Sequence, residues 1–329
     1  MVKSRITLAV AGALLATLLV VFPAAGEGLK HARFIPQWVP QAQFAGYYVA
    51  KASGIYAKYG IDLEIITGGP GRQSADYLTS GKVDFASLWL PAAITMRSEG
   101  VPLVNIAQIM QRSALMLVAK KKSGITTPQD MNGRRVGLWD PMFQVQPRAF
   151  FKKFGISVEI VPQSYTVNLF LRDGVDVASA MWYNEYHTII NDGINPDELV
   201  TFFFNDYGLN FPEDGLYVLE RTFNRDPELC KAFVRASIEG WLLAFAKPRE
   251  ALDIVMSNLI KANVPATRVH QQWMLARMKD LILPKDHPYP MGCLDPSDYQ
   301  RVTDGLSQSQ MIQEVPPFTD FYRKSIADD

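Results

Sequence analysis

The chain has 329 residues, with 33 Lys and Arg side chains against 33 Asp and Glu, so its formal net charge is zero. Nucleic-acid-binding proteins carry a clustered basic surface, and this balance argues against one. Two Cys and four scattered His give no metal-ligand spacing, so we predict neither a metal site nor a cofactor.

The N-terminal segment has the pattern of an export signal. Lys3 and Arg5 precede an uncharged apolar run at residues 6–21, and residues 22–26 supply small side chains for cleavage. A retained membrane anchor is the alternative, but this run falls short of the roughly 20 residues that span a bilayer. We predict a signal peptide over residues 1–26, its cleavage, and a periplasmic protein without a lipid anchor.

The next part of the chain alternates apolar strands with helical segments, which is typical of parallel α/β units. A helix is expected over 43–59, because apolar residues recur at helical spacing and Gly60 follows as a stop. Pro91 opens a further helix, as proline does at a first turn. Strands are expected at 30–37, 61–67, 83–89 and 103–110.

The middle of the chain repeats this alternation, and the end is mainly helical. Strands are expected at 115–119, 135–139, 158–161, 175–181, 202–205 and 215–219. We predict an α/β fold of two lobes with parallel-dominated sheets, lobe one from residues 29–112 and 215–329, and lobe two from 113–214. Two chain crossings between the lobes would make a hinge that lets them close on a ligand.

One sequence pattern occurs twice, about 90 residues apart. The first copy runs from Gly81 to Trp89 and the second from Gly174 to Trp182, and both contain Val-Asp-x-Ala-Ser before the terminal Trp. Ligands of open α/β sheets bind outside the carboxyl ends of strands, so each copy is expected to face a shared cleft. Asp84 and Asp176 are expected to tie the preceding turns.

Six stretches of the chain resemble one protein family. They include Trp-Val-Pro-Gln-Ala-Gln-Phe-Ala-Gly-Tyr-Tyr-Val-Ala at 38–50, and the stretches 54–56, 60–63, 80–85, 100–103 and 131–139. Together they resemble the periplasmic ligand-binding proteins of ABC importers, within which the family that binds thiamine-pyrimidine precursors is nearest. The resemblance covers about 33–185. It implies a type II periplasmic binding protein fold, a small-molecule ligand, an ABC permease in the inner membrane as partner, and a monomer.

Two departures from this family bear on its chemistry. Fungal pyrimidine synthases of the family carry a His soon after the first Trp and a Cys-rich iron motif, whereas this chain has Phe44 in that region and no Cys cluster. We therefore expect a binding protein rather than an enzyme. Residues 140–144 stand where many relatives carry a Gly-Asn-Glu-like run. The resemblance therefore does not identify which residues hydrogen-bond the polar atoms of the ligand.

Four Trp residues are candidates for the ligand-binding wall. Trp38 follows the first strand, and its indole would stack on a heteroaromatic ring for about 0.5–1.5 kcal/mol beyond area burial. Trp89, Trp139 and Trp182 each end a later strand. Each of the four is equally compatible with a place in the core, because Trp is often largely buried.

Polar candidates come from two turns. Gln43 lies at the start of the helix expected over 43–59 and is expected to hydrogen-bond ring nitrogens of the ligand. The alternative is an exposed polar residue at a helix start. Gly69 and Gly71 precede a helix and offer free backbone N–H groups, which favour acceptor oxygens. Arg72 beside them would pair with a carboxylate or phosphate, or lie on the surface.

Tyr183, Asn184 and Glu185 form the sharpest polar cluster, at the start of the helix after the second repeated strand. The resemblance implies that a carboxylate here accepts hydrogen bonds from an aminopyrimidine, with Tyr183 alongside. An acidic residue is also favourable at any helix start, which is the alternative. Lobe one would then offer mainly stacking surface, and lobe two the hydrogen-bonding edge.

The leading hypothesis is a periplasmic solute-binding protein that delivers a thiamine-precursor aminopyrimidine to an ABC transporter. Riboflavin and aliphatic sulfonate binders share much of the pattern and stay as alternatives. A pyrimidine-synthesising or -cleaving enzyme is the competing class. Export would permit a disulfide between Cys230 and Cys293, but Cys230 also fits a buried helix position, so the pairing stays open.

Overall fold

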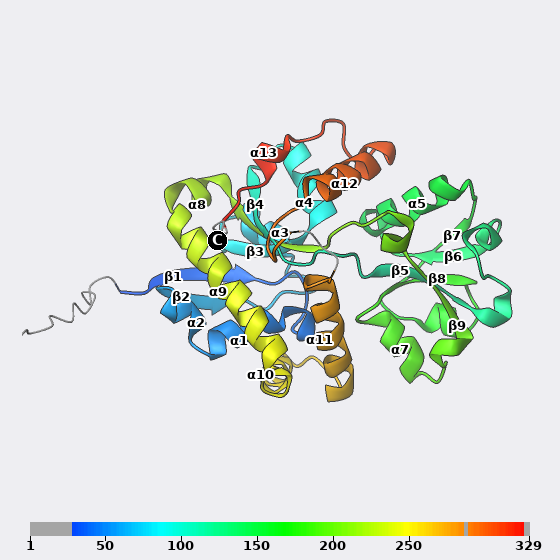
Figure 1. The fold of residues 1–329 in the computed structure, drawn as a ribbon, viewed down its shortest axis with the longest axis horizontal. Helices are drawn as coiled ribbons and strands as arrows, with labels where there is room; N and C mark the ends of the chain where they lie inside the picture. The colour runs from blue at the N-terminus through cyan, green and yellow to red at the C-terminus, as the bar shows by residue number, and fades with distance from the viewer. Residues whose placement is uncertain (1–27, 286–288, 326–329) are drawn as a thin grey trace, which may run out of the picture.

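The computed structural model describes residues 28–285 and 289–325, so the predicted signal peptide lies outside the described residues. Two lobes each contain a five-stranded sheet (Figure 1). The strands are β1 (Lys30–Ile35), β2 (Ile61–Ile65), β3 (Phe85–Trp89), β4 (Leu103–Gln108), β5 (Leu115–Lys120), β6 (Arg135–Leu138), β7 (Glu159–Pro162), β8 (Val177–Met181), β9 (Leu199–Phe203) and β10 (Asp214–Leu219). All ten expected strands are present, with β9 starting three residues earlier than expected.

The two sheets have matching topologies. The first has the order β2-β1-β3-β10-β4 and the second the order β7-β6-β8-β5-β9. β10 runs antiparallel to both of its neighbours, and so does β5, while the other pairs are parallel. These antiparallel strands are the ones that follow each crossing between the lobes. The predicted class, two parallel-dominated sheets joined by two crossings, is confirmed.

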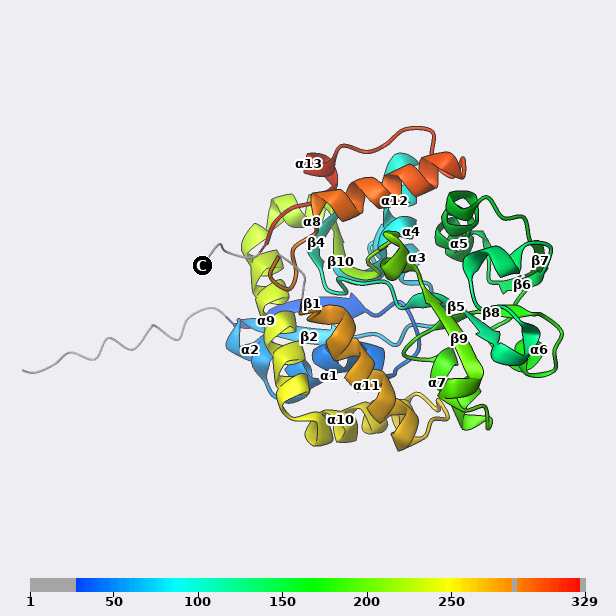
Figure 2. The ribbon, with the colours of Figure 1, turned by 45° about the vertical axis from the view of Figure 1, so that its right-hand side comes forward.

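Helices cover the sheets of both lobes (Figures 1 and 2). They are α1 (Ala45–Ala52), α2 (Ile55–Lys58), α3 (Ser74–Thr79), α4 (Leu90–Ser98), α5 (Pro141–Phe154), α6 (Asn168–Leu171), α7 (Glu185–Asn191), α8 (Glu220–Arg225), α9 (Pro227–Ala246), α10 (Pro248–Lys261), α11 (Arg268–Ile282), α12 (Pro296–Gln308) and α13 (Phe318–Phe321). Single 3₁₀ turns are η1 (Ala42–Phe44), η2 (Lys121–Ser123), η3 (Pro128–Met131), η4 (Pro196–Glu198) and η5 (Phe204–Tyr207).

The helix expected over 43–59 is wrong in one respect, because it is broken. Gly54 adopts a left-handed conformation with φ of 71°, which ends α1 and starts α2 in a new direction. α1 packs closely on α9, where the backbones approach at two glycines. A Cβ on Gly46 would lie 2.3 Å from the ring of Trp241, and one on Gly240 would lie 2.3 Å from the Gly46 carbonyl.

The repeated sequence pattern supplies the central strand of each sheet, β3 in one and β8 in the other. The aspartates before these strands perform the same task. Asp84 Oδ2 accepts a hydrogen bond from the Arg33 backbone N–H at 3.0 Å, and Asp176 Oδ2 accepts one from the Arg135 backbone N–H at 2.9 Å. Each carboxylate thus ties its turn to the adjacent parallel strand, as expected.

The two crossings are hydrogen-bonded to each other. The first runs through residues 109–114, and the second follows η5 and ends at Glu213. Asn210 accepts from the Ser113 N–H at 3.0 Å and donates to the Gln111 carbonyl at 3.0 Å. Glu213 Oε1 accepts from the N–H groups of Ala114 and Leu115 at 2.6 and 3.0 Å. The crossings therefore form one tethered hinge.

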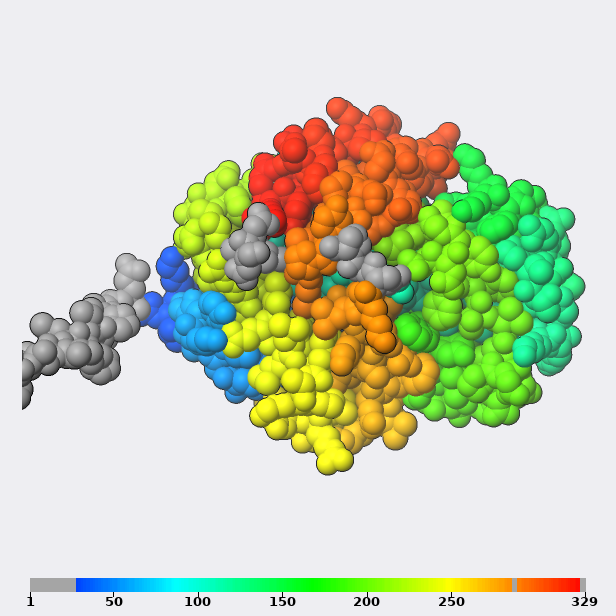
Figure 3. Space-filling view, viewed as in Figure 1, coloured from blue at the N-terminus to red at the C-terminus, as the bar shows by residue number. Residues whose placement is uncertain are grey.

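Both ends of the described chain belong to the larger lobe, as Figure 3 shows, while the middle third forms the other lobe. The C-terminal helices pack on lobe one, as expected, through α9 and α10 against α1. In addition, α11 reaches α7 and α12 reaches α5, both in lobe two. Within residues 28–285 and 289–325, none of the helices has the length and hydropathy that crossing a membrane requires.

Candidate functional site

Aromatic rings from the two lobes meet at the carboxyl ends of their strands. Trp89 ends β3 in lobe one, and its ring centroid lies 3.9 Å from that of Phe143 on α5 in lobe two. Trp38 follows β1, and its ring lies 5.3 Å from Tyr165, which follows β7. Trp139 extends the group from lobe two, 5.7 Å from Phe143. These separations are within the range of aromatic pairing, so the lobes share one aromatic wall.

A buried carboxyl group lies beside this wall. Asp214 starts β10 and is paired in register with Trp89. Its carboxylate accepts hydrogen bonds from Gln43 Nε2 at 2.8 Å and from the side-chain amide of Gln37. Burial raises the pKa of Asp214 to about 7, against the lowering effect of the Gln43 hydrogen bond. Gln43 is thus held in place by its own bond to Asp214.

A second carboxyl group, Glu213, lies in the hinge next to Asp214. Besides its two backbone donors it accepts a hydrogen bond from Ser113 Oγ at 3.3 Å. Burial and then the charge of Asp214 raise the pKa of Glu213 to about 8. Both carboxyl groups therefore keep their protons to a higher pH than ordinary Glu and Asp side chains do.

The cluster predicted in lobe two faces the same carboxyl groups. Tyr183 is buried, and its pKa is held well above the usual range by burial and then by the charges of Glu213, Asp214 and Glu185. Glu185 accepts from the Met181 N–H at 2.9 Å and from Asn184 Nδ2 at 2.7 Å. Burial raises the pKa of Glu185 as well. The phenol thus lies in the field of three carboxyl groups from both sides of the lobe junction.

The carboxyl groups lack a basic partner in the part of the chain that the structure describes. The donors found for Glu185, Glu213 and Asp214 are side-chain amides, one hydroxyl and backbone N–H groups. Such a cluster is rich in hydrogen-bond acceptors, and no Lys or Arg among the described residues pairs with it. It suits a ligand that brings N–H donors.

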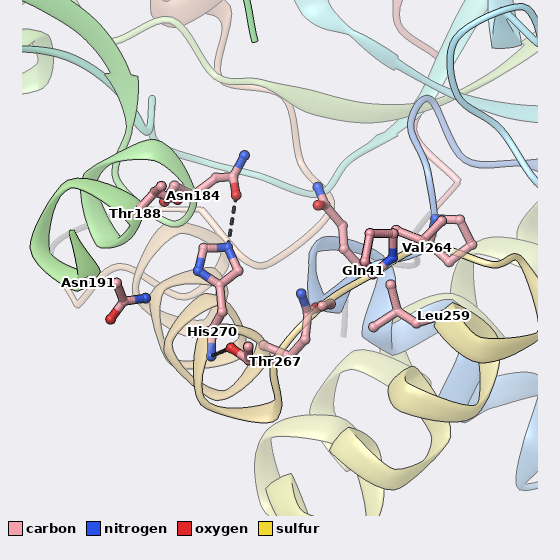
Figure 4. Close-up of a pocket in the computed structure, with 12 residues that line it drawn as sticks. Gln41, Asn184, Thr188, Asn191, Leu259, Val264, Thr267 and His270 are labelled. Atoms are coloured by element: carbon pink, nitrogen blue, oxygen red, sulfur yellow. Dashed lines mark hydrogen bonds between the residues drawn. The ribbon is translucent and has the colours of Figure 1, made fainter. Parts of the chain in front are cut away.

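A cavity of about 300 Å³ opens beside this group, between α7 of lobe two and α10–α11 of lobe one (Figure 4). Asn184 links the two regions, because its Nδ2 donates to Glu185 while its Oδ1 is 2.9 Å from Nε2 of His270. Gln41 lines the cavity from lobe one and donates to Gln43 Oε1. The cavity and the carboxyl groups are therefore neighbours.

Some predicted residues lie in other surroundings. The ring of Trp182 lies against Arg277, whose Cζ is 4.6 Å from the ring centroid, and against Phe203 at 5.5 Å. The indole N–H of Trp139 donates to the Ser164 carbonyl at 3.1 Å. These contacts give both rings structural roles, so their part in ligand binding stays a prediction.

The glycine turn forms a compact loop against the segment that carries Trp38. Gly69 has φ of 130°, and a Cβ there would lie 2.7 Å from Cγ1 of Val39. Gly71 has φ of 80° and, like Arg72, lies exposed on the turn. The turn thus supports the position of Trp38, while its ligand contacts stay a prediction.

The expected split between the lobes, stacking from lobe one and hydrogen bonding from lobe two, stays a prediction, although each lobe brings both kinds of group to the junction. Asp214 and Gln43 bring polar groups from lobe one, and Phe143 and Tyr165 bring rings from lobe two. Glu213, Asp214, Phe143, Tyr165 and His270 were not among the predicted site residues. An acidic pair directly before a strand at the return crossing was the available signal for the first two.

The two cysteines are both free and buried. Cys230 lies on α9 in lobe one, and burial raises the pKa of its thiol to about 12. Cys293 lies in the segment before α12. The disulfide left open by the sequence is therefore absent from this structure, and Cys230 behaves as a small core residue.

Similarity to characterised proteins is consistent with this arrangement. The chain is 25% identical over 260 residues to riboflavin-binding protein RibY of Chloroflexus aurantiacus, covering 76% of this chain and 72% of that protein. It is 22% identical over 298 residues to the formylaminopyrimidine-binding protein of Halalkalibacterium halodurans, covering 88% of each. A synthase of 4-amino-5-hydroxymethyl-2-methylpyrimidine phosphate from Schizosaccharomyces pombe is 24% identical over 148 residues, which is 45% of this chain and 41% of the synthase.

The fold also matches solved structures. The periplasmic aliphatic sulphonate binding protein SsuA from Escherichia coli superposes with a TM-score of 0.68 at 13% sequence identity, covering 87% of this chain and 94% of SsuA. At that identity the match shows the periplasmic binding protein fold alone. The family match extends over residues 41–251, from the start of η1 to α10. On that extent, the chain belongs to the NMT1/THI5 like family.

Proposed function

We propose that this chain is the solute-binding protein of an ABC importer and binds an aminopyrimidine of the thiamine-precursor type between its lobes. The observation that supports this most is the buried acceptor cluster of Asp214, Glu213 and Glu185 beside rings from both lobes. An aminopyrimidine brings N–H donors for the carboxyl groups and a flat ring for the aromatic wall. Hydrogen bonds to charged groups contribute about 1.5–3 kcal/mol each.

The same cluster disfavours an aliphatic sulfonate. A sulfonate is an anion and brings no N–H donor, so in this buried cluster its charge would find no Lys or Arg among the described residues and the carboxyl oxygens would find no donor. It also lacks a ring to place between Trp38, Trp89 and Phe143. The fold shared with SsuA therefore does not carry over its ligand.

Riboflavin is the second candidate. It has a flat ring system for the aromatic wall and a ring N–H for the carboxyl groups, and a riboflavin-binding protein is among the relatives of this chain. Its ring system is larger, so it would require the two lobes to open further where Trp89 now contacts Phe143 at 3.9 Å. This makes the smaller ring the leading candidate.

We assign no catalytic role to the site. Phe44 is fully buried in the core where the synthases that the sequence resembles carry a His, so this chain lacks that imidazole. Cys230 is a core residue of α9. Periplasmic localisation, cleavage of residues 1–26, a monomeric state and delivery to an inner-membrane permease belong to the same proposal.

The deciding experiment is isothermal titration calorimetry of the purified chain against four compounds. These are 4-amino-5-hydroxymethyl-2-methylpyrimidine, formylaminopyrimidine, riboflavin and an aliphatic sulfonate. The proposal expects the tightest binding from one of the two pyrimidines and none from the sulfonate. Binding of the sulfonate alone would contradict the ligand class, and turnover of a bound pyrimidine would contradict the non-enzymatic assignment.

A further inference from the structure

The cavity beside the carboxyl groups is uncharged along its whole lining. Its volume is about 300 Å³, and none of its twelve lining residues is Lys, Arg, Asp or Glu. Its polar groups are amides, hydroxyls and one imidazole, and they include Gln41, Asn184, Thr188, Asn191, Thr267 and His270, which Figure 4 shows around the space. Apolar side chains of the loop before α11 complete the wall.

The imidazole of His270 is enclosed by polar groups of lobe two. Because Asn184 Nδ2 donates to Glu185, its Oδ1 must be the atom that faces His270, so His270 Nε2 is the donor of that bond. His270 Nδ1 lies 3.0 Å from Nδ1 of His187, which is in turn 3.1 Å from Nδ2 of Asn191. Burial and then His187 lower the pKa of His270, which favours its neutral form at neutral pH.

Hydrogen bonds connect the lining of the cavity with the carboxyl groups along two routes, one in each lobe. On the lobe-one side Gln41 donates to Gln43, and Gln43 donates to Asp214. On the lobe-two side Asn184 donates to Glu185. At most one residue therefore separates the lining of the cavity from the carboxyl groups. A substituent on the adjacent edge of a ligand ring held by these carboxyl groups would enter the cavity.

We infer that this cavity receives an uncharged, hydrogen-bonding arm of the ligand, such as hydroxyl or amide groups, and excludes a phosphorylated or sulfonated one. The inference deepens the proposed function and rests on it. A volume of about 300 Å³ corresponds to roughly ten waters at about 30 Å³ each, which is enough for a short hydroxylated chain. Hydroxyls find both donors and acceptors there, whereas an anion would be desolvated without a counter-charge and beside Glu185.

Two matched pairs of compounds test the inference by calorimetry at pH 7.5. The first pair is 4-amino-5-hydroxymethyl-2-methylpyrimidine and its phosphate, and the second is riboflavin and riboflavin 5′-phosphate. In whichever pair binds, we expect the uncharged compound to bind at least about tenfold more tightly than its phosphate. A tenfold ratio of dissociation constants corresponds to about 1.4 kcal/mol. Equal binding of both members, or tighter binding of the phosphate, would overturn the inference while leaving the proposed function intact. If no member of either pair binds and formylaminopyrimidine does not bind either, the proposed function would instead be refuted.

A charge placed in the cavity gives the second arm of the test. Asn191→Lys adds a cation to the lining at the exposed end of α7. We expect it to lower, by several-fold, the ratio of the affinity for the uncharged compound to the affinity for its phosphate. Gln129→Lys adds the same charge on the exposed η3 turn of the same lobe, outside the lining, and should leave the ratio unchanged. If Asn191→Lys and Gln129→Lys changed the affinity ratio equally, the ratio would depend on the net charge of the protein and not on the cavity, which would overturn the inference.

Discussion

His187 and His270 meet across the two lobes, with their Nδ1 atoms 3.0 Å apart. His187 belongs to α7 of lobe two and His270 to α11 of lobe one, 83 residues away in the chain. Trp273 extends the contact, since its ring stacks on His187 at 4.8 Å and its N–H donates to the Trp182 carbonyl at 3.0 Å. This group of side chains holds the lobes together at one edge of the site.

Protonation of the two histidines should weaken this contact. Burial lowers the pKa of His187, and burial with His187 lowers that of His270, below the ordinary value of 6.5. The unfolded chain therefore takes up protons first as the pH falls below about 6.5, and the stabilisation present above that pH is lost. We expect the melting temperature to fall between pH 7 and pH 5.

The variant His270→Gln isolates this effect. Glutamine keeps a donor for Asn184 Oδ1 but cannot gain a charge, so the fall in melting temperature between pH 7 and pH 5 should be smaller than in the wild type. His31→Gln is the control, because His31 is exposed and pairs with Asp62 on the surface of lobe one. An unchanged pH profile in His270→Gln would contradict the prediction.

Glu213 should make the hinge sensitive to alkaline pH. Its pKa is raised from 4.5 to about 8, so the folded state binds more protons than the unfolded chain between these values. The associated stabilisation is present below the unfolded value and is lost as the pH rises through about 8. Glu213→Gln keeps an oxygen that accepts from Ala114 and Leu115 and should lose less stability between pH 7 and pH 9.

Denaturation in urea at pH 7, 8 and 9 measures this difference. Glu159→Gln on β7 removes an exposed carboxylate and serves as the control for net charge. If the wild type and Glu213→Gln lost equal stability over this pH range, Glu213 would not be the cause of the alkaline sensitivity.

Trp38 should contribute to binding without being needed for folding. It is only partly buried in the loop after β1, and its ring contacts Tyr165 of the other lobe. Trp38→Ala is expected to weaken binding of a heteroaromatic ligand by about 2- to 10-fold, as loss of an aromatic contact of about 0.5–1.5 kcal/mol implies. Calorimetry measures the affinity, and thermal unfolding checks the fold.

Trp182→Phe is the comparison variant, because the Trp182 ring lies against Arg277 and Phe203. Its affinity for ligand should fall less than that of Trp38→Ala, because phenylalanine keeps an aromatic ring. A larger loss of affinity in Trp182→Phe than in Trp38→Ala would place the binding surface on the Trp182 ring.

Gly46→Ala tests the close packing of α1 on α9. The new methyl group would lie 2.3 Å from the buried ring of Trp241, which has no open space to move into. Overpacking of this kind costs about 1–3 kcal/mol, which urea denaturation can measure. Lys51→Ala on the exposed face of the same helix should change stability by less than about 0.5 kcal/mol.

The strands could be predicted from the sequence because most are short, buried apolar runs between turn residues, and β2 alternates apolar with charged residues. The repeated pattern was informative for the same reason, since Val-Asp before a strand and Trp after it mark the ends of a buried central strand. α5 was not predicted, because Pro147 in its interior argues against a helix when only local propensity is considered.

Candidate site residues could be named from the sequence mainly where they end or follow a strand, as Trp38, Trp89 and Tyr183 do. The contact of Phe143 with Trp89 depends on how α5 docks across the junction, and the contact of His187 with His270 joins two helices distant in the chain. Neither relationship has a local signal. Glu213 and Asp214 differ, because their residue types are conspicuous but their burial depends on the return of β10 between β3 and β4.

The position of β10 has a consequence for the order in which the chain can fold. β10 lies between β3 and β4, so the first sheet lacks an interior strand until residues 214–219 have been made or translocated. The second sheet uses residues 115–203 without interruption, and domains tend to fold as units from the N-terminal side. We expect lobe two to complete its sheet first. The earlier half of lobe one would then wait with the facing edges of β3 and β4 unpaired until the chain returns.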